Sequence, residues 1–323
     1  MLPLAHVGAG ALALGEVAAV LVAAALYWRR SRTLARQGRP VPTGRQLAYY
    51  GGIALLALAV TTPLAHVADE LFVAHMAEHL LLGDVATLLI AVGLTGPVLA
   101  PVLRAGPLDR LRVLSHPLIA LPLWAANLYV WHLPALHQGA LDYGPVHALQ
   151  HALFVALGVN MWLPLFGPLP RPAWFGTVGK LAYIVAVRLI GAVLGNVLTW
   201  SGTVFYSRYA PGEAFWGIAP LRDQGSAGLL MMVEGSLLTI ILFGWLFVDA
   251  ARQGEERQEL LDLAAARGVA LTAERAARAV AAGRGEELRR RLEDRAPGED
   301  QPDDDHHGHH DVDEEPEGLR LRT

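Results

Sequence analysis

The sequence contains no cysteine among its 323 residues. Disulfides, thiolate metal sites and thiol redox chemistry are therefore excluded. Charge is also scarce, because only 17% of the residues are Asp, Glu, Lys or Arg, whereas 53% are hydrophobic. Any metal ligands must come from histidine, methionine or carboxylate side chains.

The hydrophobic residues are concentrated in residues 1–250, and residues 251–323 are polar and rich in charge. The mean hydropathy of the whole chain is +0.35. This segregation is typical of a polytopic membrane protein with a tail, so the lipid bilayer is the expected surrounding of residues 1–250. The net charge of −4 comes largely from the tail, and no nucleic-acid partner is expected.

Seven apolar segments are long enough to cross a bilayer as helices, the form that satisfies its own backbone hydrogen bonds in lipid. They cover about 5–27, 46–66, 71–100, 116–133, 145–166, 181–202 and 226–250. The first ten residues lack a basic segment, so no cleavable signal peptide is expected. The predicted fold class is all-α, a polytopic membrane protein with a seven-helix transmembrane bundle.

The distribution of Arg and Lys predicts the orientation. Eleven basic residues lie in the loops after the first, third and fifth segments, and only Arg208 and Arg222 lie in the alternate loops. The N-terminus is therefore expected outside, and the C-terminus in the cytoplasm of a bacterial plasma membrane.

Three domains are predicted. Residues 1–250 form the transmembrane domain, and 251–296 form a small cytoplasmic helical segment with breaks near Gly268 and Gly283. Residues 297–323 are acidic and are expected to be disordered. Their string "DDDHHGHHD" is expected to bind divalent metal weakly.

Histidines gather at the outer ends of the segments. Nine histidines lie in residues 1–250, and only His116 is on the inner side. The eight outer ones are His6, His66, His75, His79, His132, His137, His147 and His151.

Two histidine pairs have i, i+4 spacing: His75 and His79 in "HMAEH", and His147 and His151 in "HALQH". This spacing places both imidazoles of a pair on one helix face, about 6 Å apart along the axis. Each pair can chelate one metal. If the third and fifth segments touch, the two pairs form one four-nitrogen site or two sites. Hydrogen bonding between helices is the alternative.

Softer ligands belong to the same outer layer. Met231 and Met232 open the seventh segment, and His132 closes the fourth. Imidazole and thioether without thiolate suit copper better than zinc or iron, although core packing is an alternative role for the methionines. The predicted metal ligands are His75, His79, His147, His151, His132, Met231 and Met232. Since histidine binds metal only when neutral, loading is expected to weaken as pH falls through about 6.5.

Three charged residues lie deeper in the apolar segments: Asp84, Arg188 and Glu234. Such groups are costly in hydrocarbon, so they are expected to pair with one another or with water. A proton or ion path is the alternative.

Three stretches together resemble a known family. They are "HMAEHLLLGDVATLLIAVGLTGPV", "WHLPALHQGALDYGPVHALQHALF" and "MWLPLFG". They look like the caa3-type cytochrome c oxidase assembly factors, CtaG, over about residues 45–250. An unrelated copper chaperone family with the same name uses cysteines, which this chain lacks.

The resemblance implies a membrane protein that matures a haem–copper oxidase and has an oxidase subunit as its partner. The matching histidines are His75, His79, His132, His147 and His151. The family's task and the ligand chemistry together predict a copper-delivering assembly factor and not an enzyme.

Other functions fit some of these residues. Histidines that face each other across helices can hold haem, as in a membrane cytochrome. A copper importer or resistance protein would use the charged residues as a path across the bilayer. The segment "HMAEH" also matches the H-x-x-E-H pattern of zinc metalloproteases, with Glu78 as the base.

Overall fold

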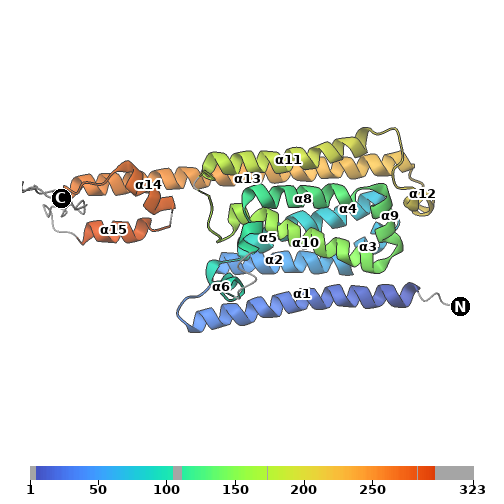
Figure 1. Cartoon of the computed structure of the whole chain (residues 1–323), viewed down its shortest axis with the longest axis horizontal. Coiled ribbons are helices and arrows are strands. Elements are labelled where there is room, and N and C mark those ends of the chain that lie inside the picture. Colours follow the sequence, from blue (N-terminus) through green and yellow to red (C-terminus); the bar gives the residue numbers. More distant parts are fainter. Residues whose placement is uncertain (1–4, 105–110, 173, 282, 295–323) are drawn as a thin grey trace, which may run out of the picture. The chain divides into compact units, whose positions relative to one another are not determined.

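The computed structural model describes residues 5–104, 111–172, 174–281 and 283–294, with the side chains of 5–13, 111 and 112 left out. Within these ranges the protein is helical and has no strands (Figure 1). The chain divides into two compact units, Met1–Leu246 and Phe247–Thr323. The predicted disordered tail, 297–323, lies outside the described residues, as does the side chain of His6.

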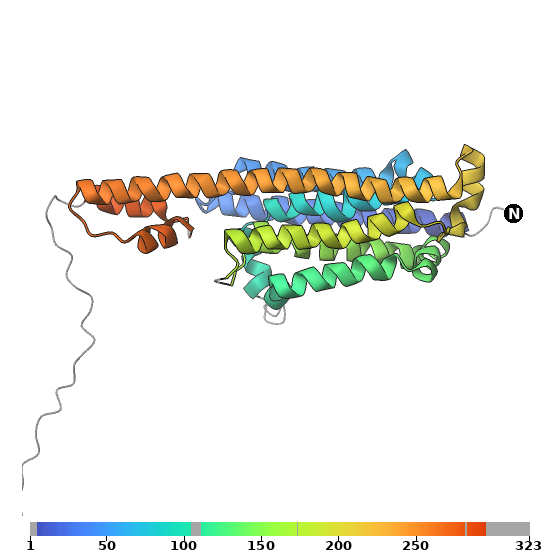
Figure 2. The same ribbon diagram turned by 90° about the horizontal axis from the view of Figure 1, so that it is seen from above.

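The first unit is built from helices of very different lengths. They are α1 (Ala5–Arg36), α2 (Thr43–Thr61), α3 (Pro63–Ala68), α4 (Phe72–Leu80), a π-helical turn (Leu81–Val85), α5 (Ala86–Gly93), α6 (Gly96–Arg104), α7 (Leu111–Leu114), α8 (Pro117–Trp131), α9 (Pro134–Asp142), α10 (Gly144–Phe166), α11 (Thr177–Trp200), a 3₁₀ turn (Ser207–Tyr209), α12 (Ala210–Trp216) and α13 (Pro220–Ala266). The long helices run along one common direction, as Figure 2 shows for α1, α11 and the first part of α13.

Four helical stretches are long and apolar enough to cross a membrane: Phe72–Gly93, Gly144–Phe166, Thr177–Trp200 and Pro220–Ala266. A fifth is possible if α8 and α9, which meet at 72°, are counted as one bent span. The predicted helical membrane protein is confirmed, whereas the count of seven is not. The predicted spans 5–27 and 46–66 correspond to α1 and α2, and α2 begins with the polar residues Thr43, Arg45 and Gln46.

Proline and local caps set where several helices begin. Pro63, Pro117 and Pro134 each occupy the first turn of a helix, where the missing N–H costs nothing. The side chain of His116 accepts a hydrogen bond from the N–H of Leu118 and caps α8. This inner histidine therefore has a structural role.

The π-helical turn interrupts the span that carries the first histidine pair. Its freed carbonyl groups are satisfied from the side: the hydroxyl of Thr87 donates to the carbonyls of Gly83 and Asp84, and the indole N–H of Trp162 donates to Asp84 at 3.2 Å. In lipid this compensation is required, because no water replaces the lost helical bonds. The turn also binds the span to α10, which carries Trp162.

Glycines bring helix backbones together at several places, of which two concern the candidate site and the helix α13. A Cβ on Gly158 of α10 would overlap the carbonyl oxygen of Gly83, and one on Gly228 of α13 would overlap the carbonyl oxygen of Gly195 on α11. Each contact lets two helices approach more closely than side chains would allow.

The second unit holds the end of α13 with α14 (Ala273–Ala281) and α15 (Gly285–Glu293). Leu260, Ala264, Val280 and Leu292 form its core. Gly268 and Gly283, where breaks are predicted, both have a positive φ, near +69° and +66°. That conformation suits glycine and ends the helix before it.

Candidate metal centre

The two histidine pairs meet because the span Phe72–Gly93 packs along α10 (Figure 1). Within each pair the rings lie 4.2 Å (His75 and His79) and 4.3 Å (His147 and His151) apart, centroid to centroid. Across the helices, His75 lies 5.6 Å from His147, and His79 lies 5.4 Å from His151. We call these four residues the histidine cluster.

The donor atoms of the histidine cluster are close enough to share an ion. One ligand atom from each of His75, His79 and His147 lies within 4.8 Å of the other two. The same holds for Glu78, His147 and His151. Glu78 therefore belongs with the pair on the opposite helix, and His147 is common to both groups.

The histidine cluster is largely buried, and most of its ring nitrogens lack a protein partner. His75 has no exposed surface and His79 has 4%. Both ring nitrogens of each, and Nε2 of His147 and of His151, are buried without a hydrogen bond. Unpaired buried donors and acceptors cost roughly 1–3 kcal/mol each. A bound cation would satisfy the unprotonated nitrogens, so the donor set fits a metal.

A carboxylate from α1 orients one member of the cluster. Nδ1 of His151 lies 3.1 Å from Oε1 of Glu16. An Nδ1–H that donates to this carboxylate leaves Nε2 as the lone-pair nitrogen, the arrangement found around metal-bound histidines. Sequence reasoning missed Glu16, although it is the one acidic residue in the first apolar segment.

A layer of aromatic residues covers one end of the cluster. His137 of α9 is 4.7 Å from His75 between ring centroids, and its Nε2 is 3.0 Å from the hydroxyl of Tyr209. Both residues are almost fully buried. His137 was predicted to lie in the outer layer but not among the ligands.

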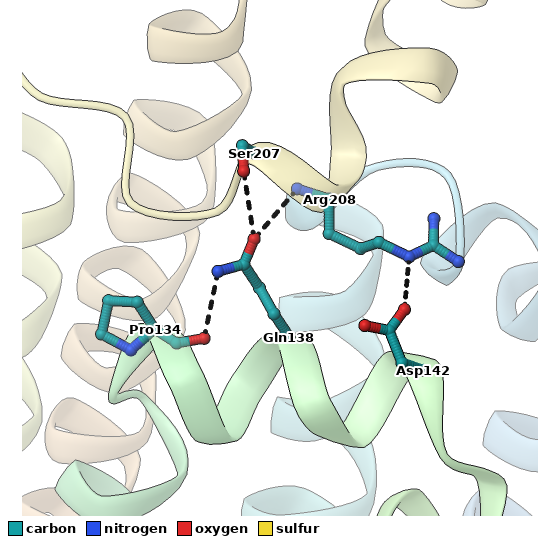
Figure 3. Close-up of polar contacts among 5 residues, drawn as sticks. All are labelled: Pro134, Gln138, Asp142, Ser207 and Arg208. Carbon is teal, nitrogen blue, oxygen red and sulfur yellow. Dashed lines mark hydrogen bonds and ion pairs between the residues drawn. The ribbon is translucent and has the colours of Figure 1, made fainter.

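Surface contacts hold α9 in this position (Figure 3). The side-chain oxygen of Gln138 accepts hydrogen bonds from the hydroxyl of Ser207 and the N–H of Arg208, each at 3.2 Å. The guanidinium of Arg208 pairs with Asp142 at 2.9 Å. We call α9 with the turn Ser207–Tyr209 the cover.

Acidic groups also lie beside the cover. Asp69 follows α3, and burial raises the pKa of its carboxyl, although the charges of Arg208 and His66 oppose this. The neighbouring Glu70 accepts a hydrogen bond from the indole N–H of Trp216. As pH falls, Asp69 thus loses its charge earlier than an ordinary aspartate.

The other predicted ligands divide between two places. His132 and Met231 line a small cavity that also contains part of His79. Met232 instead packs against α11, where its Cγ lies 3.0 Å from the position of a Cβ on Gly195. The structure therefore brings His132 and Met231 to the edge of the histidine cluster, and Met232 faces another helix.

The deeper charged residues lie together. Asp84 and Glu234 interact with each other and with Arg188. The guanidinium of Arg188 lies directly over Gly235, where no side chain stands in its way. These contacts agree with the expectation that the three charges compensate one another.

Comparison with known proteins identifies the family. The family described as cytochrome c oxidase caa3 assembly factor matches residues 25–253. The chain belongs to the caa3 assembly factor family. Every member of the histidine cluster lies within the residues that match the family, and Glu16 lies before them.

The chain also has relatives among curated proteins. An uncharacterised protein of Mycobacterium bovis and one of Mycobacterium tuberculosis are each 27% identical over 255 residues, covering 73% of this chain and 38% of the relative. One from Mycobacterium leprae is 25% identical, covering 68% of this chain and 36% of the relative. The chain thus spans less than two fifths of these proteins, and no solved structure matches it.

Proposed function

We propose that this assembly factor binds copper in the histidine cluster and delivers it to a subunit of a haem–copper oxidase within the membrane. The observation that carries the proposal is the convergence of His75, His79, His147 and His151 with buried, unpartnered nitrogens. The family's role in oxidase assembly supplies the recipient. The proposal includes seven membrane crossings of a bacterial plasma membrane, with the C-terminus in the cytoplasm.

The ligand chemistry supports copper and a site from which the metal can leave. No thiolate is present, because the chain has no cysteine. Imidazole and thioether ligands without thiolate suit copper. A metal held only by neutral ligands can be exchanged more readily than one in a closed thiolate site, which suits delivery.

The geometry supports an ion over a haem group. The rings of His75 and His147 are stacked only 5.6 Å apart. The cavity that His79 lines has a volume of about 40 Å³, far below the roughly 300 Å³ or more of usual cofactor pockets. A larger cavity of about 270 Å³ borders His151 and Glu16 but none of the other three histidines of the cluster.

The decisive experiment is copper analysis of purified protein with and without the histidine cluster. The four histidines of the tail, His306, His307, His309 and His310, are first replaced with asparagine in the full-length chain so that they cannot bind metal themselves. In this background we expect about one copper or more per chain, and its loss in the variant with His75, His79, His147 and His151 all changed to alanine. The same loss should follow acidification, because protons compete with copper for imidazole nitrogen.

The loss of copper is informative only if the variant is still folded. Thermal unfolding of the variant in detergent tests this. A His116→Ala variant is the matched control, since this histidine caps α8 and is not among the residues of the cluster. Equal copper in the cluster variant and in the control would refute the proposal.

Removing the charge of Glu16 should weaken copper binding without abolishing it. In Glu16→Gln the imidazole of His151 loses its anionic partner, and such supporting contacts are typically worth about 10- to 100-fold in metal affinity. Titration against a coloured Cu(I) chelator measures the affinity. Asp142→Asn is the control, because its ion pair with Arg208 is exposed; an unchanged affinity in Glu16→Gln would remove Glu16 from the site.

A further inference from the structure

A second set of ligands lines the small cavity next to the histidine cluster. The cavity has a volume of about 40 Å³, and the residues around it include Met76, His79, Asp84, His132 and Met231. This is enough space for an ion or one or two water molecules. His79 belongs to both the cavity and the cluster.

The free nitrogen of His132 is defined by the structure. Its Nδ1 lies 2.7 Å from the backbone carbonyl oxygen of Leu128, so Nδ1–H is the donor. Nε2 is then unprotonated, and it is buried without a partner. An imidazole held in this tautomer is ready to bind a metal.

Two thioethers complete the set. Met76 is 1% exposed and Met231 is 5% exposed, so both are shielded from water and lipid. Met76 precedes His79 by three residues, which places the two on one face of α4. Met231 comes from α13 and His132 follows the end of α8, so three separate helices contribute.

A carboxylate also borders the cavity, although it interacts with Arg188 and Glu234 as well. Asp84 lies in the π-helical turn, and its Oδ1 is buried without a hydrogen bond. A π-helical turn often marks a functional site. Here it carries a carboxylate at the edge of a cavity that otherwise offers only neutral ligands.

We propose that this cavity is a second copper site, selective for Cu(I), with His79, His132, Met76 and Met231 as its ligands. The inference rests on the proposed function, because the histidine cluster is the source of the ion. Thioethers favour Cu(I) over harder ions.

His79 belongs to both sets of ligands, so copper can move directly from the histidine cluster to the second site. Copper passes between them by ligand exchange: bonds to His75 and His147 break while bonds to His132 and the two sulfurs form. The oxidation state does not change, and no proton moves because every ligand is neutral. The ion is thus bound first by the nitrogen ligands of the histidine cluster and then by the nitrogen and sulfur ligands of the second site.

The test is copper stoichiometry together with X-ray absorption at the copper edge. The full-length chain with the four tail histidines changed to asparagine is loaded with Cu(I) without oxygen. We expect about two copper ions per chain, with His79 bound only to the second ion and His75, His147 and His151 left for the first, because a neutral imidazole has one lone-pair nitrogen. We also expect a sulfur shell in the absorption spectrum. In Met76→Leu/Met231→Leu the sulfur shell should disappear and the stoichiometry should fall to about one.

Met161→Leu is the matched control, because Met161 is equally buried on α10 but does not line the cavity. It should keep both ions and the sulfur shell. Thermal unfolding confirms that each variant is folded, and the spectrum of the unchanged protein tests the sulfur ligands even if the double variant is unstable.

The outcomes separate the two proposals. Copper bound by nitrogen alone, with the same amount in all three proteins, would overturn the second site and leave the histidine cluster standing. A protein that binds no copper would overturn both.

Discussion

Replacing Gly158 with valine should destabilise the protein and weaken copper binding together. A Cβ at this position would overlap the carbonyl oxygen of Gly83 and lie 2.9 Å from the hydroxyl oxygen of Thr87. The helix α10 must then move away from the span that carries His75 and His79. Overpacking of this kind typically costs about 1–3 kcal/mol, and here the contact is with rigid backbone.

The measurement is thermal unfolding in detergent, followed by titration with Cu(I). Gly191→Ala is the control, because a Cβ at Gly191 of α11 meets nothing within 4 Å. That change should be neutral or stabilising by about 0.5–1 kcal/mol, since alanine favours helix. If Gly158→Val unfolds and binds copper like the unchanged protein, the glycine contact does not set the spacing of the cluster.

Replacing Asp223 with alanine should have the second large effect. The carboxylate of this residue, at the start of α13, accepts hydrogen bonds from the backbone N–H groups of Phe72 at 2.7 Å and Val73 at 3.0 Å. It therefore caps the helix that carries His75 and His79. Hydrogen bonds to charged groups are worth roughly 1.5–3 kcal/mol each, so we expect a loss of about 3 kcal/mol or more.

An Asp223→Asn variant distinguishes the effect of the hydrogen bonds from the effect of the side-chain volume. Asp223→Asn keeps one oxygen acceptor and nearly the same volume, so its stability should lie between those of the alanine variant and the unchanged protein. Thermal unfolding of the three proteins gives the order. Equal stability of the alanine and asparagine variants would show that the hydrogen bonds contribute little.

The sequence predicts the helices and the histidine pairs because both depend on local spacing. The i, i+4 pattern of His75 and His79 needs only helical geometry, and the span around it is recognised by its apolar length. The all-helical membrane fold follows from the same reasoning.

What the sequence cannot predict depends on contacts between distant segments. The two histidine pairs meet because Gly158 approaches Gly83 closely. No feature of the sequence around these two glycines distinguishes them from the other glycines of the chain. The π-helical turn has no recognisable pattern of apolar residues in the sequence. The sequence also does not tell which of Met231 and Met232 faces the cluster. Neighbouring residues on a helix point in directions about 100° apart, so the packing of α13 against the other helices decides it.

The cover over the histidine cluster has a consequence for rates. Since His75 has no exposed surface, an ion that enters from the side of the cover reaches it when α9 and the turn Ser207–Tyr209 move apart. The contacts between α9 and this turn are an exposed ion pair, two hydrogen bonds to Gln138 and the buried hydrogen bond between His137 and Tyr209. Exposed ion pairs are worth at most about 1 kcal/mol. For the copper site proposed above, the speed of uptake then depends on how often these contacts open, whereas the time that copper stays depends on the ligands beneath them.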